Sequence, residues 1–122
     1  MIGLGIDAVD VERFRAVLAR RPTIAGRLFT TGEREYACRL ADPAPSLAAR
    51  FAAKEAVMKA LGVGLGAIGW HDVEVVRLES GAPSLVVSGV AAALASRLGV
   101  GNWRVSLTHT AAFAEAVVAA LP

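Results

Sequence analysis

One short stretch of the sequence gathers three cations around a single carboxylate. Arg50, Lys54, Glu55 and Lys59 span less than three turns if the segment is helical. One carboxylate with several cations suits a hard metal ion bound to phosphates, because Mg²⁺ takes one or two protein carboxylates and keeps its waters. Glu55 and Lys59 are also a favourable i,i+4 ion pair, worth about 0.2–0.5 kcal/mol on a helix. A plain salt-bridged helix therefore explains the cluster as well as a phosphate site does.

The residues around this cluster predict the clearest helix of the chain. Ser46 is a suitable N-cap and Gly62 a suitable end, with an alanine-rich segment between them. Lys54 projects into the middle of an apolar stripe, so its ammonium group must reach solvent or meet an anion. That stripe, which we expect to be the buried face, consists of Leu47, Phe51, Met58 and Leu61.

Two other residues could contribute chemistry from outside this helix. The apolar run Met1–Ile6 predicts a buried strand that delivers the carboxylate of Asp7 at its end, although Asp7 could equally be a polar strand terminus or a helix cap. His109 follows an alternating strand, and a lone histidine is more often a surface residue or a satisfied core residue than a ligand.

The remaining elements alternate between short helices and strands, which indicates a single α+β domain over residues 1–122. Thr30 and Glu33 have the spacing of a capping box, so a short helix should begin there. The alanines of Ala114–Ala120 leave a helix open as well as a strand. The other expected elements are helices at Val11–Arg20 and Val90–Leu98, a hairpin of Val73–Leu78 with Ser84–Val87, and a strand at Arg104–His109.

Composition restricts the function classes. Hydrophobic residues make up 55% of the 122 residues, so a stable core is expected, and the net charge of +2 is small for a nucleic-acid-binding protein. The single cysteine excludes an internal disulfide and a cysteine-based zinc site. No export signal and no apolar run long enough for a membrane span is present, which predicts a cytoplasmic location without membrane contact.

Two sequence patterns remain open or are rejected. Five arginines and no acid lie between Glu12 and Glu33, either as a solvated helix face or as a docking patch for an acidic partner.

The segment Gly64–Gly69 fits G-x-G-x-x-G, but it follows a predicted helix rather than a strand, which disfavours a Rossmann phosphate loop. Neither a P-loop motif nor H-E-x-x-H occurs.

Three sequence blocks resemble the signature blocks of the acyl-carrier-protein synthase family of 4′-phosphopantetheinyl transferases. They are Gly3–Asp7 with Val11–Arg13, Arg50–Gly62 with its Lys54-Glu55-x-x-x-Lys59 core, and Val105–His109. The blocks occur in family order, and Thr30, Glu33 and Asp72–Glu74 match as well, so the resemblance covers nearly the whole chain. It implies Mg²⁺-dependent transfer of 4′-phosphopantetheine from coenzyme A to a serine of an apo acyl carrier protein, in fatty-acid or polyketide biosynthesis.

The resemblance also implies residue roles. Asp7 and Glu55 would be the magnesium ligands. Lys59 would neutralise charge on the departing adenosine 3′,5′-bisphosphate and could protonate it. Glu55, or a metal-bound water that it orients, would take the proton from the carrier serine. These three residues would form the catalytic set.

Further roles concern the donor, the partner and the assembly. Lys54 could contact phosphate or could be the ion-pair partner that holds the acidic site. The arginine at position 13 would reach a neighbouring subunit or the acidic carrier protein. Relatives of this kind form homotrimers with an active site at each interface, and their fold packs an antiparallel sheet on a long central helix. Residues expected at coenzyme A are Arg50, Lys54, Lys59, Gly62, Gly64, Pro83, Thr108 and His109.

Two other function classes compete with this interpretation. A noncatalytic subunit that binds coenzyme A or a carrier protein would keep the fold without the chemistry, but Asp7, Glu55 and Lys59 argue against it. A basic nucleic-acid-binding domain is disfavoured by the few aromatic residues and by the lack of a Lys/Arg track.

Overall fold

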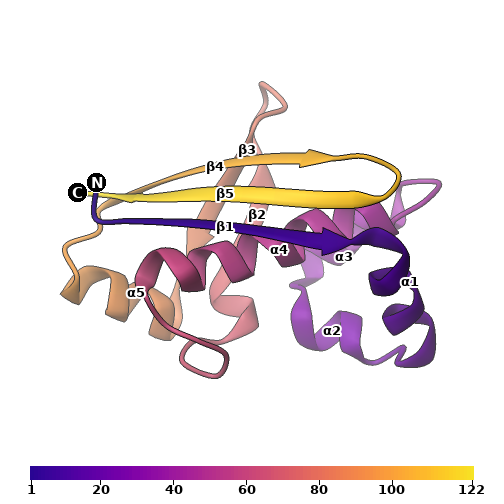
Figure 1. Ribbon diagram of the computed structural model, residues 1–122, viewed down its shortest axis with the longest axis horizontal. Coiled ribbons are helices and arrows are strands. Elements are labelled where there is room, and N and C mark those ends of the chain that lie inside the picture. Colours follow the sequence, from indigo (N-terminus) through magenta and orange to yellow (C-terminus); the bar gives the residue numbers. More distant parts are fainter.

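The computed structural model describes all 122 residues and confirms the α+β class, with two antiparallel sheets (Figure 1). None of the helices has the length and the apolar composition that crossing a membrane requires. In chain order the elements are β1 (Gly3–Asp10), α1 (Val11–Arg20), α2 (Ile24–Leu28), α3 (Thr31–Cys38), α4 (Ala44–Leu61), the 3₁₀ turn η1 (Trp70–Asp72), β2 (Val73–Arg77), β3 (Pro83–Val87), α5 (Gly89–Arg97), β4 (Asn102–His109) and β5 (Phe113–Leu121).

The larger sheet has the strand order β1-β5-β4, with β5 antiparallel to both neighbours. Hydrogen-bonded ladders on both sides make Ala114–Ala120 part of a strand, so the helical alternative is wrong. Alternate residues of β5 face the helices and are buried, and this ladder outweighs the helix propensity of alanine. The buried set is Ala114, Ala116, Val118 and Ala120.

Helix α4 packs against β1 and β5 and is covered on most sides, because α1, α3 and β2 also contact it. The predicted single buried stripe is therefore too narrow: Ala49, Ala53 and Ala60 are buried as well. The helix also begins at Ala44 rather than after Ser46, with Pro45 in its first turn, where a missing N–H costs nothing. Gly62 ends the helix as predicted, in the left-handed conformation with φ 73°.

Strand β1 is longer than predicted and Asp7 does not lie at its end. The strand continues to Asp10, whose carboxylate caps α1 by accepting a hydrogen bond of 3.0 Å from the Arg13 N–H. Asp7 is therefore an internal strand residue, and the helix-cap interpretation applies to Asp10 instead. The capping box of Thr30 and Glu33 is present at the start of α3 as predicted.

Two glycines let β1 approach α4 unusually closely. A Cβ atom added at Gly3 would lie 1.8 Å from the Ala60 carbonyl oxygen, and one at Gly5 would lie 1.8 Å from that of Ala56. Any larger residue must push the strand away from the helix. The close approach matters because Asp7 is the next residue of β1 on the same side of the strand.

We expect Gly5→Ala to lower the free energy of unfolding by about 1–3 kcal/mol, because the added methyl group has no room against α4. Urea unfolding measures the effect. Gly64→Ala is the matched control, since no atom lies within 4 Å of a Cβ atom added there, and it should be nearly neutral. Equal stabilities for the two variants would contradict the tight strand–helix contact.

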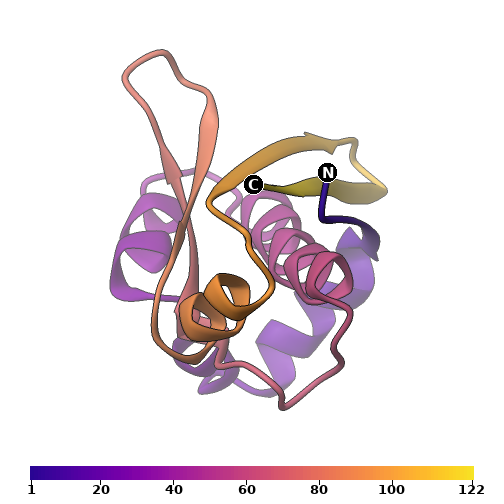
Figure 2. The ribbon, with the colours of Figure 1, turned by 90° about the vertical axis from the view of Figure 1, so that its left-hand side faces the viewer.

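All helices lie on one side of the larger sheet, and its other face is open (Figures 1 and 2). Leu4 and Ile6 on β1 are 59% and 63% exposed, and Val117 on β5 is also exposed. The β2–β3 hairpin rises beside this face as a projecting arm (Figure 2). An apolar sheet face of this kind is typical of a contact surface.

Candidate active site

Asp7 and Glu55 meet in a groove with a volume of about 630 Å³. Asp7 enters from β1 and Glu55 from α4, and the close glycine contact between these elements holds both carboxylates at one wall. Arg13 on α1 lines the same groove. The structure thus brings together Asp7 and Arg13 of the first sequence block with Glu55 of the second.

Lys59 completes this cluster by bonding to β1. Its Nζ donates to Asp7 Oδ1 at 3.1 Å and to the Ile6 carbonyl oxygen at 2.8 Å, across 52 positions of sequence in the first case. The i,i+4 ion pair between Lys59 and Glu55 is not formed. The plain salt-bridged helix is therefore not what the chain adopts, because the lysine turns to the strand.

Glu55 has no hydrogen-bond partner within the protein and lies half-buried. Burial raises the pKa of its carboxyl group, the nearby charge of Asp7 raises the pKa further, and Lys59 acts in the opposite direction. A carboxylate with a raised pKa is a better proton acceptor than a solvated one. The groove therefore holds a reactive carboxylate beside a second one.

The donor set of the groove suits a magnesium ion. No group of three or more His, Cys, Asp or Glu side chains comes together, as an all-protein metal cage would need. Mg²⁺ instead needs only one or two carboxylates when substrate phosphates and waters supply the remaining oxygens. Asp7 and Glu55 repel each other, and Glu55 has no hydrogen-bond partner, so this pair of carboxylates fits such an ion.

Other lining residues of the groove are apolar and aromatic. Phe51 lies 5.2 Å from the Phe14 ring and stacks on Trp70 at 5.3 Å between ring centroids. All three rings line the groove. The groove is therefore lined both by charged side chains and by apolar aromatic rings.

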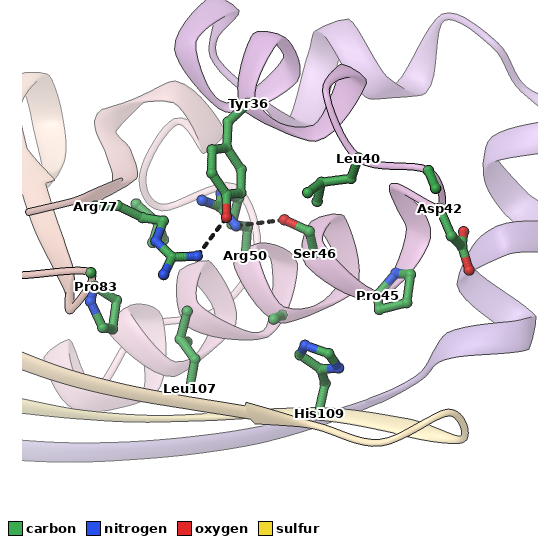
Figure 3. Close-up of a pocket in the computed structure, with 14 residues that line it drawn as sticks. Tyr36, Leu40, Asp42, Pro45, Ser46, Arg50, Arg77, Pro83, Leu107 and His109 are labelled. Atoms are coloured by element: carbon green, nitrogen blue, oxygen red, sulfur yellow. Dashed lines mark hydrogen bonds between the residues drawn. The ribbon is translucent and has the colours of Figure 1, made fainter.

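A second cavity, of about 530 Å³, lies on another side of α4 and contains Arg50, Pro83 and His109 (Figure 3). His109 ends β4, whereas Asp7 is on β1, and β5 lies between these strands. The strands that carry Asp7 and His109 are thus about 10 Å apart across the sheet, by strand spacing alone. We call the first cavity the acidic groove and the second the arginine pocket.

Arg50 dominates the arginine pocket. Only 5% of the residue is exposed, its Nη1 donates to Ser46 Oγ at 2.7 Å, and its buried Nε has no partner. Burial lowers the pKa of this guanidinium group, and no carboxylate forms an ion pair with it. A buried cation without a counter-ion makes this cavity a receptor for anions.

Two residues of the arginine pocket were not predicted from the sequence. The Tyr36 ring lies 4.5 Å from the Arg50 guanidinium carbon, and the Tyr36 hydroxyl accepts a hydrogen bond of 2.5 Å from Arg77 (Figure 3). Tyr36 comes from α3 and Arg77 from β2, 41 positions apart. No sequence spacing joins them, so only the fold reveals this contact.

Lys54 is held inside the protein, not in either cavity. Its Nζ forms an ion pair of 2.8 Å with Glu33 and donates to the Trp70 and Val73 carbonyl oxygens. These three partners use all the hydrogens of the ammonium group, and the residue is 0% exposed. Of the two roles expected for Lys54, the geometry favours the ion pair over the phosphate contact. The partner is Glu33, however, and not an acid of the acidic groove.

We expect Lys54→Met to destabilise the fold by about 3–5 kcal/mol, because it leaves the Glu33 carboxylate buried without its cation. Urea unfolding checks this, and Glu33→Gln in the same chain should restore part of the loss. Unchanged stability with a raised KM for coenzyme A would instead support the phosphate contact that the resemblance implies.

The other predicted donor-binding residues lie outside both cavities. Gly62 ends α4 and Gly64 lies in the loop that follows, where its surroundings are open. Thr108 alternates with His109 along β4 and belongs to the helix-free face of the sheet. His71, for which the sequence suggested no role, bonds to the Gly26 carbonyl oxygen at 2.8 Å.

Residues 3–120 match the 4′-phosphopantetheinyl transferase superfamily. The chain belongs to this family. The acidic groove and the arginine pocket are thus features of a 4′-phosphopantetheinyl transferase fold.

Several individual relatives are similar along their full length. A holo-[acyl-carrier-protein] synthase of Frankia casuarinae is 54% identical over 120 residues, which cover 98% of this chain and 97% of the relative. The crystal structure of the synthase from Neisseria meningitidis superimposes with a TM-score of 0.91 at 27% identity, covering 100% and 99% of the two chains. The synthase of Helicobacter pylori, solved in complex with coenzyme A, gives a TM-score of 0.85 at 29% identity, covering 97% and 99%.

Proposed function

We propose that this protein transfers the 4′-phosphopantetheine group from coenzyme A to a serine of an apo acyl carrier protein, in a Mg²⁺-dependent reaction that serves fatty-acid or polyketide biosynthesis. The observation that supports this most directly is that Asp7 and Glu55 line the same groove and that Lys59 bonds to Asp7. The names of relatives at about half identity over nearly the full chain support the same reaction.

The chemistry follows from the two carboxylates and the lysine. The carrier serine attacks the phosphorus next to the pantetheine arm, the new P–O bond forms, and the bond to adenosine 3′,5′-bisphosphate breaks. Glu55, whose pKa is raised by burial, accepts the serine proton. Lys59 lies beside Asp7, where its charge stabilises the departing phosphate.

A magnesium ion held by Asp7 and Glu55 would supply positive charge to the diphosphate of coenzyme A. The chain's own residues prepare the site for that charge. Lys59 binds one oxygen of Asp7 and so orients this carboxylate, while Glu55 has both oxygens free of protein partners.

The arginine pocket is the proposed site for the remaining anionic part of coenzyme A, with Arg50, Pro83 and His109 as its contacts. Within one chain this pocket lies across the sheet from Asp7, and we propose that two copies combine to enclose one donor molecule. The open apolar face of the sheet, which includes Leu4 and Ile6, offers the contact surface. We therefore propose a homotrimer with an active site at each subunit interface.

The carrier protein is proposed to dock on α1. Arg13 lines the acidic groove and lies in the segment that carries arginines but no acids between Glu12 and Glu33. Acyl carrier proteins are acidic, so charge complementarity would guide the carrier serine toward Glu55.

Mass spectrometry tests the proposed function directly. The protein is incubated with Mg²⁺, coenzyme A and an apo carrier protein, and we expect one added phosphopantetheine per carrier. The control carrier has its acceptor serine replaced by alanine and should gain nothing. Absence of the adduct on each of several carrier proteins would rule out the transferase.

A further inference from the structure

Tyr36 occupies the centre of an unusual group of cations. Its ring has three guanidinium carbons within 6 Å: that of Arg50 at 4.5 Å, that of Arg77 at 5.6 Å and that of Arg39 at 5.7 Å. None of these arginines forms an ion pair with a carboxylate. Like charges repel, so something must hold this group in place before an anion arrives.

Nearby acids do not neutralise the group. Asp42 also lines the arginine pocket, but Arg15 holds it through two hydrogen bonds of 2.6 and 3.0 Å. Glu33 on α3 bonds through its oxygens to Lys54 and to the N–H groups of Thr30 and Val75. Apart from the hydrogen bond from Arg50 to Ser46, the side-chain hydrogen-bond and cation–π contacts of these three arginines are with Tyr36.

Tyr36 contacts them in two separate ways. The face of its ring lies over the Arg50 guanidinium, where the ring quadrupole attracts a cation most strongly when the cation is desolvated, as Arg50 is. Its hydroxyl accepts a hydrogen bond from Arg77 (Figure 3). The ring thus fixes one arginine and the hydroxyl fixes the other.

We propose that Tyr36 is a positioning residue that holds Arg50 and Arg77 in the geometry that receives an anionic group of coenzyme A. Tyr36 acts through these arginines. Because the arginine pocket lies apart from Glu55 and Lys59, the effect belongs to donor binding rather than to the chemical step. This inference rests on the proposed function for the identity of the ligand.

The test measures coenzyme A affinity by calorimetry and KM and kcat by the transfer assay. Tyr36→Leu removes both contacts, and we expect coenzyme A to bind about tenfold more weakly, with a matching rise in KM and little change in kcat. Tyr36→Phe keeps the ring over Arg50 and should weaken binding by only about threefold. The KM for the carrier protein should stay the same in both variants.

A double-mutant cycle separates positioning from simple packing. Because Tyr36 also holds Arg77, Tyr36→Leu added to Arg50→Ala should weaken coenzyme A binding by only about threefold, which is less than its tenfold effect on the wild-type protein. Additive losses, or wild-type affinity in Tyr36→Leu, would overturn the proposal. If Tyr36→Leu does not fold, the test uses Tyr36→Phe in a double-mutant cycle with Arg77→Ala. Additive losses of coenzyme A affinity in that cycle would also overturn the proposal.

The two readouts distinguish this proposal from the proposed function. A wild-type protein that binds coenzyme A without transferring it would reject the transferase, while the calorimetric cycle would still decide the role of Tyr36. A wild-type protein that does not bind coenzyme A would overturn both.

Discussion

Glu55→Gln should lower kcat/KM for phosphopantetheine transfer by about 10²–10⁴-fold, the range expected for loss of a general base. Glutamine keeps the shape of Glu55 but cannot accept the serine proton, and it removes one of the two anionic oxygen donors of the acidic groove. The dependence of the remaining activity on Mg²⁺ concentration should weaken as well. The mass-spectrometric transfer assay at several Mg²⁺ concentrations measures both effects.

Stability provides the control for this variant. Glu55 has no hydrogen-bond partner, and its raised pKa means that its charged form is disfavoured in the folded protein. Glu55→Gln should therefore not lower the free energy of unfolding at neutral pH, and any gain should vanish as the pH falls and Glu55 becomes protonated. Glu35→Gln, at an exposed site on α3, should leave activity unchanged. Normal turnover by Glu55→Gln would refute the proposed base.

At a coenzyme A concentration too low for the Arg50→Ala parent to bind it, mixed oligomers should regain activity that neither parent variant shows. Glu55→Gln damages the acidic groove and Arg50→Ala damages the arginine pocket. If each active site combines the groove of one subunit with the pocket of the next, random mixing leaves about one site in four with both halves intact. The two proteins are unfolded together in urea, refolded as a mixture and assayed, with about a quarter of wild-type activity expected.

A second mixture serves as the matched control. Glu55→Gln and Asp7→Asn both damage the acidic groove, so no combination of their subunits restores a complete site. This mixture should remain inactive. If the first mixture is also inactive although it forms three-chain particles by light scattering, each active site lies within one chain and the interfacial arrangement is wrong.

The sequence alone determined the features that depend on local spacing. Gly62 ended α4 as expected, and Thr30 with Glu33 formed the predicted capping box, because both signals act within one turn of helix. The family blocks also identified Asp7 and Glu55 as a pair before any contact between them was visible.

Other features depended on contacts between distant segments. Lys54 and Lys59 look alike in the sequence, yet Lys54 is buried against Glu33 whereas Lys59 reaches Asp7. Which lysine faces the groove depends on the elements that surround α4. The strand at Ala114–Ala120 is a similar case, since its ladders with β1 and β4 overrode the propensity of alanine.

Local chemistry along the chain was thus sufficient to predict which residue types could bind a metal and phosphate, whereas the prediction that Asp7 and Glu55 act together came from the family resemblance. Only the tertiary structure decided that the predicted site residues divide between two cavities, and that Tyr36 and Arg77 join Arg50 in one of them. The physical reason is that short-range spacing controls caps, turns and helix faces, whereas the sheet order, with β5 between Asp7 and His109, depends on the packing of the whole chain.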